Sequence, residues 1–168
     1  MADWSTGGFY FLSGYEFISL DRPSAAGGVG IFLCSSFNYF IGHDLCCMLH
    51  YIKCLFIELP KNGKQNIIMG CIYRPSNTKS NADTNLFNSE LKSILISIDN
   101  SKKKTILLAG DYNLDQLDSD DQYVSDFINN LLAYSYLPAI TRPTRITQNF
   151  KTLLDNIYIY FLIALTCS

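Results

Sequence analysis

The chain has 168 residues, of which 48% are hydrophobic and 14% aromatic, and it carries a net charge of −2 with a pI of about 5.6. This length favours one domain with a real core, and the composition excludes a disordered or fibrous chain. The slightly acidic balance argues against a strong general nucleic-acid binder, because phosphate contacts need clustered Lys and Arg.

Short apolar runs bounded by Gly, Pro, Asn or Lys predict strands, and apolar residues at helical spacing predict helices. In chain order, we expect strands at 28–33, 54–59 and 67–73, a helix at 84–98, a strand at 105–109, a helix at 122–134 and a strand at 154–160. Strands that alternate with helices indicate a layered α/β fold. The two histidines, His43 and His50, fall between the first two strands, where we expect structural or surface roles.

The six cysteines have no metal-ligand spacing, and the adjacent Cys46 and Cys47 do not form a C-x-x-C site. We therefore expect free thiols in a reducing, intracellular compartment, nuclear or cytoplasmic and not secreted. The first residues lack the basic and apolar regions of a secretory signal. The apolar stretch 157–165 is shorter than the roughly 20 residues that span a bilayer, so we expect no membrane partner.

The most informative stretch runs from Thr105 to Asn113. An apolar strand carries a glycine and then delivers a carboxylate, Asp111, and a carboxamide, Asn113, two residues apart. Because side chains at i and i+2 of an extended segment point the same way, we expect both groups to leave the strand end side by side. There the carboxylate can accept a proton or hold a cation. Asp and Asn also favour turns, so the motif taken alone favours a buried strand followed by an Asx turn.

Seven short motifs follow one another along the chain, at 14–15, 27–32, 55–58, 72–77, 109–115, 141–147 and 153–158. The third to the seventh read Leu-Phe-Ile-Glu, Ile-Tyr-Arg-Pro-Ser-Asn, Ala-Gly-Asp-Tyr-Asn-Leu-Asp, Thr-Arg-Pro-Thr-Arg-Ile-Thr and Leu-Leu-Asp-Asn-Ile-Tyr. In this order they resemble the endonuclease/exonuclease/phosphatase superfamily, and more narrowly the endonuclease domain of non-LTR (LINE-type) retrotransposons.

This resemblance implies an α/β fold, the four-layer α/β sandwich in which two packed sheets are flanked by helices, here incomplete at both termini. Residues 1–160 would form the partial domain and 161–168 an apolar tail. The implied activity is hydrolysis of a DNA phosphodiester that nicks target DNA for retrotransposition. DNA would be the partner and Mg²⁺ or Mn²⁺ the cofactor, with no other small-molecule cofactor.

The resemblance also implies catalytic roles for four residues. Asp111 would activate or orient the attacking water, and Asn113 would hold the phosphate or a hydrated metal, so both would be metal ligands. Tyr73 would hydrogen-bond the developing phosphorane oxygen, although a half-buried strand aromatic is the simpler alternative. Asp155 would support the site, or it is only a carboxylate in the turn that enters a strand.

Three arginines are candidates for contact with DNA. Arg74 could pair with a phosphate oxygen in bidentate fashion, or it could be a surface charge. Arg142 and Arg145 flank Pro143 in a segment that faces DNA in the resembling proteins, but cations in such a loop can equally be solvated.

The chain departs from the pattern of these proteins at both ends. If Trp4 holds the usual Trp position, Ala2 stands where the main Mg²⁺-ligating Glu belongs, and Asp3 is out of register by one residue. The end at Ser168 comes without the Ser-Asp-His of these proteins. We therefore expect weak or absent Mg²⁺ binding and no detectable nicking.

Two functions remain open: a Mg²⁺-dependent endonuclease domain, or a catalytically inactive relic that at most binds DNA weakly. A phosphatase or phosphodiesterase of the same superfamily is a more distant alternative. We also expect low solubility, because the strands at 28–33 and 153–165 would lack neighbours and expose apolar edges.

Overall fold

A computed structural model describes residues 12–20, 28–63, 65–77, 80–99 and 105–161. Its centre is a seven-stranded sheet in the order β3-β5-β6-β7-β11-β8, with β4 also paired to β5. These strands are β3 (Phe40–Ile41), β4 (Cys47–Met48), β5 (Lys53–Leu59), β6 (Ile67–Tyr73), β7 (Thr105–Asp111), β8 (Tyr136–Pro138) and β11 (Asp155–Tyr160). The β6–β7 pair is parallel, and the other pairs of this sheet are antiparallel.

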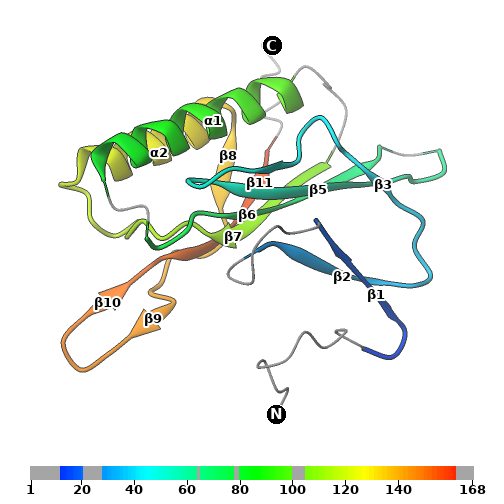
Figure 1. Cartoon of the computed structure of the whole chain (residues 1–168), viewed down its shortest axis with the longest axis horizontal. Helices are drawn as coiled ribbons and strands as arrows, with labels where there is room; N and C mark the ends of the chain where they lie inside the picture. The colour runs from blue at the N-terminus through cyan, green and yellow to red at the C-terminus, as the bar shows by residue number, and fades with distance from the viewer. Residues whose placement is uncertain (1–11, 21–27, 64, 78–79, 100–104, 162–168) are drawn as a thin grey trace, which may run out of the picture.

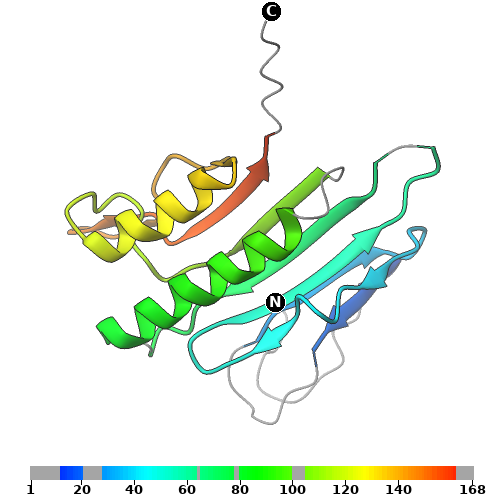
Figure 2. The same cartoon turned by 90° about the horizontal axis from the view of Figure 1, so that it is seen from above.

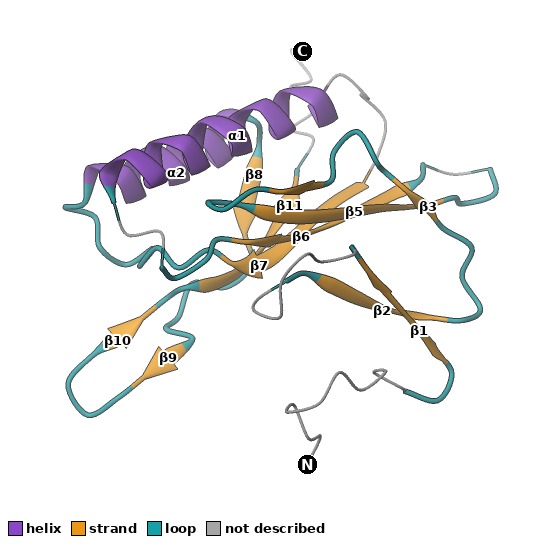
Figure 3. Ribbon diagram, in the orientation of Figure 1, coloured by secondary structure: helices purple, strands orange, loops and turns teal. Residues whose placement is uncertain are grey.

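Two helices and a two-stranded ribbon lie on opposite faces of this sheet. The helices α1 (Asn81–Asp99) and α2 (Gln122–Ala133) lie side by side on one face (Figures 1 and 2). The antiparallel pair of β1 (Tyr15–Ser19) and β2 (Gly30–Cys34) lies on the other (Figure 3). The described residues thus form three of the four expected layers, namely helices, large sheet and small sheet. An outer helical layer over β1 and β2 is not found among them.

A separate hairpin projects from the end of the large sheet at which β7 ends and β11 begins. It consists of β9 (Arg145–Ile146) and β10 (Lys151–Thr152), which pair with each other and with no other described strand, and it precedes β11 in the chain. Figure 1 shows it standing away from the three layers.

Local sequence explains where the helices begin. Ser80 accepts a hydrogen bond from the backbone N–H of Asp83 (3.1 Å) and donates one to its carboxylate (2.6 Å), which satisfies a free donor at the start of α1. Asp121 caps α2 by accepting from the N–H of Tyr123 (2.7 Å). Each helix then buries one apolar stripe against the sheet: Phe87, Leu91, Ile94, Leu95 and Ile98 in α1, and Val124, Phe127 and Leu131 in α2.

The sheet separates two hydrophobic cores of unequal size. The larger core lies between the sheet and the helices, where the aromatic rings of Tyr112, Phe127 and Tyr158 meet with centroids 5.0 to 6.0 Å apart. The smaller core lies between β5, β6 and the ribbon and is built around Leu55, Ile57 and residues of β1 and β2.

The predicted helices and five predicted strands are confirmed, with ends shifted by up to three residues. The strand predicted at 105–109 continues through Gly110 to Asp111, because this segment stays paired with β6 and β11. Six short strands were not predicted, namely β1, β3, β4, β8, β9 and β10. Four of them have only two residues, too few to show a periodicity.

The expectation of missing strand neighbours was wrong. The strand β11 pairs with β7 on one side and with β8 on the other, and β2 pairs with β1 along its full length. Among the described residues, no element covers one face of this part of the sheet, where Ile157 and Ile159 remain 40% and 38% exposed. The position of Trp4 and most of the predicted tail, 162–168, lie outside the described residues.

Candidate active site

Four polar side chains form a lateral row at one end of the large sheet. Tyr73 on β6 is the register partner of Asp111 on β7, and Asp111 is the register partner of Asp155 on β11. On the other side, Tyr73 is the register partner of Lys53 on β5. Register partners share a face and lie about 4.8 Å apart across a sheet, so the four side chains leave the same face in sequence. We call Lys53, Tyr73, Asp111 and Asp155 the polar row.

The two carboxylates of the polar row share one guanidinium. Arg145 donates from Nη2 to Oδ2 of Asp111 at 2.8 Å, and its Nε lies 3.9 Å from Oδ2 of Asp155. The hydroxyl of Thr144 donates to the same Asp155 oxygen at 2.9 Å. The start of the β9–β10 hairpin thus brings two consecutive residues, Thr144 and Arg145, to the two carboxylates.

Asp111 is held in a mixed environment. Burial raises the pKa of its carboxyl above the ordinary value of 3.8, and the N–H of Asn113 opposes that rise. The neighbouring charge of Asp155 raises this pKa further, whereas Arg145 lowers it. A carboxylate with a raised pKa holds a proton more firmly, which suits a group that accepts a proton from water.

Asn113 lies beside Asp111, but not in the way that the strand spacing predicted. The strand ends at Asp111, and Asn113 adopts a left-handed backbone conformation with φ of 48°. Its N–H donates to Oδ1 of Asp111 at 3.1 Å, which is an Asx turn, and its side-chain amide donates to the carbonyl of Arg74 at 2.6 Å. The i, i+2 argument was wrong here, because it requires extended backbone through Asn113. The amide oxygen is the part of this side chain left for a ligand.

Arg74 has a position that contradicts the prediction of a DNA-contacting side chain. It is 4% exposed, and its guanidinium donates to the carbonyl of Asn113 at 3.0 Å and to the hydroxyl of Thr84 at 2.8 Å. The same guanidinium lies 5.9 Å from the ring centroid of Phe87. Because Arg74 follows Tyr73 directly, its side chain leaves the opposite face of the strand end, towards α1. It therefore fixes the turn after Asp111 to the helix.

Gly110 explains why a glycine precedes the carboxylate. A Cβ at this position would overlap the backbone carbonyl of Ile72, its register partner on the parallel strand β6. Any larger residue would push β7 from β6 and displace Asp111 relative to Tyr73. Farther along, Asp115 accepts from the N–H of Leu153 (3.0 Å) and thereby ties the loop after Asn113 to the start of β11.

Arg142 and the two histidines are the remaining residues considered in the sequence analysis. Arg142 is exposed in the segment before the β9–β10 hairpin, three residues from Arg145. The histidines lie elsewhere: Nε2 of His50 is 3.1 Å from Asp83 at the beginning of α1, and His43 is in the segment between β3 and β4. No histidine of the described residues joins the polar row.

The donor set at the polar row does not by itself fit a Mg²⁺ site. Such a site takes near-octahedral oxygen ligands, commonly carboxylates with water and phosphate. Within the described ranges, no group of three or more His, Cys, Asp or Glu side chains could hold a metal ion. Asp111 and Asp155 are two carboxylates, and Arg145 already supplies positive charge to both. The expected ligand pair therefore offers one carboxylate that is already ion-paired and one amide oxygen, because Asn113 uses its amide nitrogen on Arg74.

Sequence reasoning missed Lys53 and Thr144. Lys53 gave no local signal, since it is a single lysine at the beginning of an apolar run. Thr144 stands in the Thr-Arg-Pro-Thr-Arg motif, next to Arg145, but its hydroxyl contact with Asp155 depends on how the hairpin folds back. The missing information was strand register for Lys53 and the path of the hairpin for Thr144.

No family model and no curated protein match the sequence. The fold, however, is similar to solved structures. The endonuclease domain of TRAS1, a telomere-specific non-LTR retrotransposon, is 12% identical with a TM-score of 0.65, over 89% of this chain and 66% of that one. The catalytic domain of human Nocturnin is 14% identical with a TM-score of 0.61, over 88% and 61%.

An endonuclease/exonuclease/phosphatase family protein from Bacteroides thetaiotaomicron is 14% identical with a TM-score of 0.59, over 89% and 60%. The chain therefore has the α/β sandwich fold of endonuclease/exonuclease/phosphatase proteins, as the sequence motifs predicted. It spans about two thirds or less of the length of these structures. Neither described helix is long and apolar enough to cross a membrane.

Proposed function

We propose that this chain is the phosphodiester-binding part of a DNA endonuclease of the non-LTR retrotransposon type, and that by itself it hydrolyses DNA poorly. The observation that carries the proposal is the polar row with Arg145: a phenol, two carboxylates and a guanidinium gather at one end of the sheet. Water activation and phosphate binding need these kinds of groups.

In this proposal, each residue of the site has a different role at the phosphate. Arg145 is half exposed, with 51% of its side chain accessible, so it can exchange a carboxylate for a phosphate oxygen. Tyr73, one strand from Asp111, would donate its hydroxyl to a second phosphate oxygen. Asp111 would then orient an attacking water, and Asp155 would keep Arg145 and Thr144 in place.

The β9–β10 hairpin supports a nucleic acid as the partner. Phe150 is 70% exposed between Thr147 and Lys151, and Ile146 is similarly exposed on the paired strand. Exposed apolar side chains beside cations can insert against bases while the cations contact phosphates. Arg142, Arg145 and Lys151 provide such cations at the base and side of the hairpin. Mg²⁺ or Mn²⁺ remains the proposed cofactor of a complete site, to which Asp111 and Asn113 would contribute.

A second candidate is DNA binding without hydrolysis. It is favoured by the ion pair between Arg145 and Asp111, because this guanidinium lowers the pKa of the carboxyl against the effect of burial and competes with a metal for the carboxylate. General acid–base help is commonly worth roughly 10²- to 10⁴-fold in rate, so its loss would make nicking hard to detect.

Both candidates are tested by nicking of supercoiled plasmid with Mg²⁺, with Mn²⁺ and with chelator, alongside binding of a labelled DNA duplex. We expect duplex binding that Arg145→Gln weakens, and no nicking above the chelator control. Nicking that needs the metal and disappears in Asp111→Ala would show that the chain is a competent endonuclease. Absence of both binding and nicking would refute the proposal.

A further inference from the structure

Lys53 extends the polar row by one strand. It is the first residue of β5 and the register partner of Tyr73, which in turn is the register partner of Asp111. The row therefore crosses four adjacent strands in the order Lys53, Tyr73, Asp111 and Asp155. A cation stands at the β5 end, and Arg145 stands between the two carboxylates at the other.

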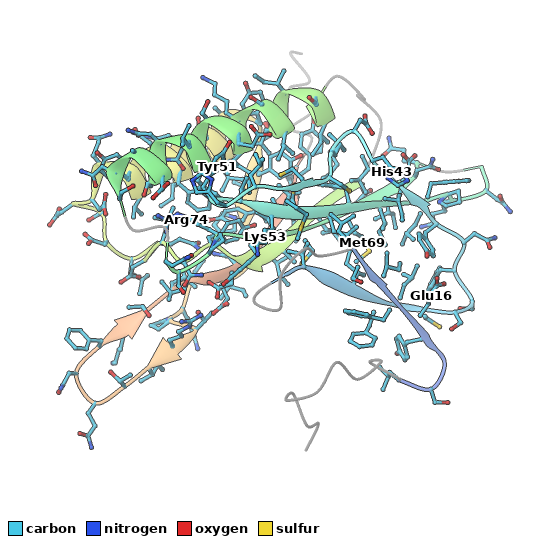
Figure 4. The ribbon with its side chains drawn as sticks, in the orientation of Figure 1. Glu16, His43, Tyr51, Lys53, Met69 and Arg74 are labelled. Carbon is cyan, nitrogen blue, oxygen red and sulfur yellow. The ribbon has the colours of Figure 1, made fainter. Side chains whose placement is uncertain are left out.

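The strand alternation fixes the face from which Lys53 leaves. Leu55 and Ile57, two and four residues along β5, pack in the smaller core on the face away from the helices. Cys54 and Phe56 pack in the larger core on the helix face. Lys53 therefore shares its face with Leu55, Tyr73 and Asp111. Figure 4 shows Lys53 at the same end of the sheet as the β9–β10 hairpin, with Arg74 nearby.

The distance between Lys53 and Asp111 across the sheet can be compared with the spacing of nucleotides along a DNA strand. Two strand intervals separate Lys53 from Asp111, which is about 9.6 Å between backbones. One DNA strand advances about 3.4 Å per nucleotide along the helix axis. If one phosphate lies at Asp111 and Tyr73, the flexible Lys53 side chain can therefore reach a phosphate within the next few nucleotides of the same strand.

We propose that Lys53 binds a backbone phosphate flanking the one held at Asp111 and Tyr73, so that the ligand is a DNA strand that runs along the polar row from β5 towards β11. This inference rests on the proposed function and adds to it a second phosphate contact and the course of the bound strand. An isolated phosphate monoester would occupy the centre of the row and leave Lys53 unused, whereas a strand uses the cations on both sides.

The experiment compares the salt dependence of duplex binding in the full chain and two charge-matched variants, Lys53→Gln and Lys61→Gln. Both remove one positive charge, but Lys61 is exposed beyond the opposite end of β5, roughly 20 Å of extended strand away. Each neutralised phosphate of a duplex contributes about 0.9 to the slope of log K against log salt concentration. We expect Lys53→Gln to lower this slope by about 0.9, Lys61→Gln to leave it unchanged, and Lys53→Arg to restore it.

Two further measurements separate this inference from the proposed function. Binding of inorganic phosphate should be the same in the parent chain and in Lys53→Gln, because a single phosphate does not reach Lys53. Thermal melting of each variant shows whether a loss of binding is caused by misfolding. The variant Lys53→Arg separates the effect of the charge from that of the packing of the aliphatic stem.

An unchanged salt slope in Lys53→Gln, or an equal decrease of the slope in Lys61→Gln, overturns the role of Lys53. The proposed function would still stand in that case if duplex binding depends on Arg145. A loss of inorganic phosphate binding in Lys53→Gln would also overturn it, since Lys53 would then belong to the central phosphate. If the parent chain does not bind duplex at all, the proposed function fails, and the role of Lys53 fails with it.

Discussion

The two faces of the large sheet differ in how completely they are covered and in which side chains they carry. The face under α1 and α2 is closed by interlocking aromatic and aliphatic side chains, and Phe127, Leu91 and Tyr112 are fully buried there. In the described part of the chain, β1 and β2 cover the opposite face over β5 and β6 only, and Ile157 and Ile159 of β11 stay partly exposed on it. The polar row lies on this second face.

This difference shows why the candidate site lies where it does. Charged groups buried beneath the helices would lose their hydration without enough partners, whereas the open face leaves water beside Asp111, Asp155 and Arg145. The helix face therefore carries the larger hydrophobic core, and the opposite face carries the candidate site. Four predictions test this division, from the largest expected effect to the smallest.

Removing an aromatic side chain from the helix face should have the largest effect on stability. Phe127→Ala deletes a fully buried ring that contacts Tyr112 and Tyr158, so we expect the free energy of unfolding to fall by about 3–5 kcal/mol. Phe150→Ala is the matched control, because that ring is largely exposed on the hairpin, and its effect should stay within about 0.5 kcal/mol. Denaturant unfolding measures both, and similar losses would contradict the division.

The two arginines near Asp111 should respond in opposite ways. Arg74→Gln leaves the buried carbonyl of Asn113 and the hydroxyl of Thr84 with poorer partners, so we expect a loss of about 1–3 kcal/mol in unfolding free energy. Arg145→Gln breaks a partly exposed ion pair and should change stability by at most about 1 kcal/mol. Duplex binding should show the reverse order, with the greater loss in Arg145→Gln. A variant pair with equal effects on both measurements would argue against this assignment.

The open apolar area over β7 and β11 should govern association more than stability. Ile157→Thr and Ile159→Thr keep β-branched side chains in the strand, so we expect changes in unfolding free energy below about 1 kcal/mol. Exposed apolar groups favour self-association, and sizing chromatography should therefore show less oligomer in the double variant than in the parent chain. A parent chain that elutes as a monomer and melts cooperatively would refute our expectation of poor solubility.

The smallest effect should be a pH dependence caused by Asp111. Its pKa is raised in the folded chain, so the folded state binds more protons than the unfolded state between the ordinary value of 3.8 and the raised value. Asp111 therefore lowers stability as pH rises through this window. Asp111→Asn removes the ionisation, and its stability relative to the parent chain should increase from acidic to neutral pH. The free energy of unfolding of both chains is measured across this pH range. A difference between variant and parent that stays constant, or that decreases as pH rises, would contradict the claim.

Much of the fold was readable from local patterns. The helices at 84–98 and 122–134 and the strand Ile67–Tyr73 were predicted closely, because a periodic apolar stripe or a bounded apolar run is a property of the segment itself. The motif order also predicted the superfamily fold. The short strands β3, β4, β9 and β10 were missed, since two paired residues depend on a neighbour and not on their own sequence.

The site was predicted less evenly. Tyr73, Asp111 and Asp155 were identified and are brought together by register, although their catalytic roles remain proposals. Arg74 was placed wrongly, because alternation along β6 turns its side chain towards α1, and no local signal distinguishes that face from the other. The directions of the Asn113 and Arg145 side chains likewise could not be inferred from spacing.

The sequence by itself determined which segments could become strands and helices, and which carboxylates, phenol and arginines stand at their ends. Only the tertiary structure decided which of these groups meet. Lys53 and Asp155 are 102 positions apart in the chain but lie in one row, because pairing of β5, β6, β7 and β11 sets a single register across all four strands. Register depends on backbone hydrogen bonds and core packing between distant segments, and these are properties of the assembled sheet.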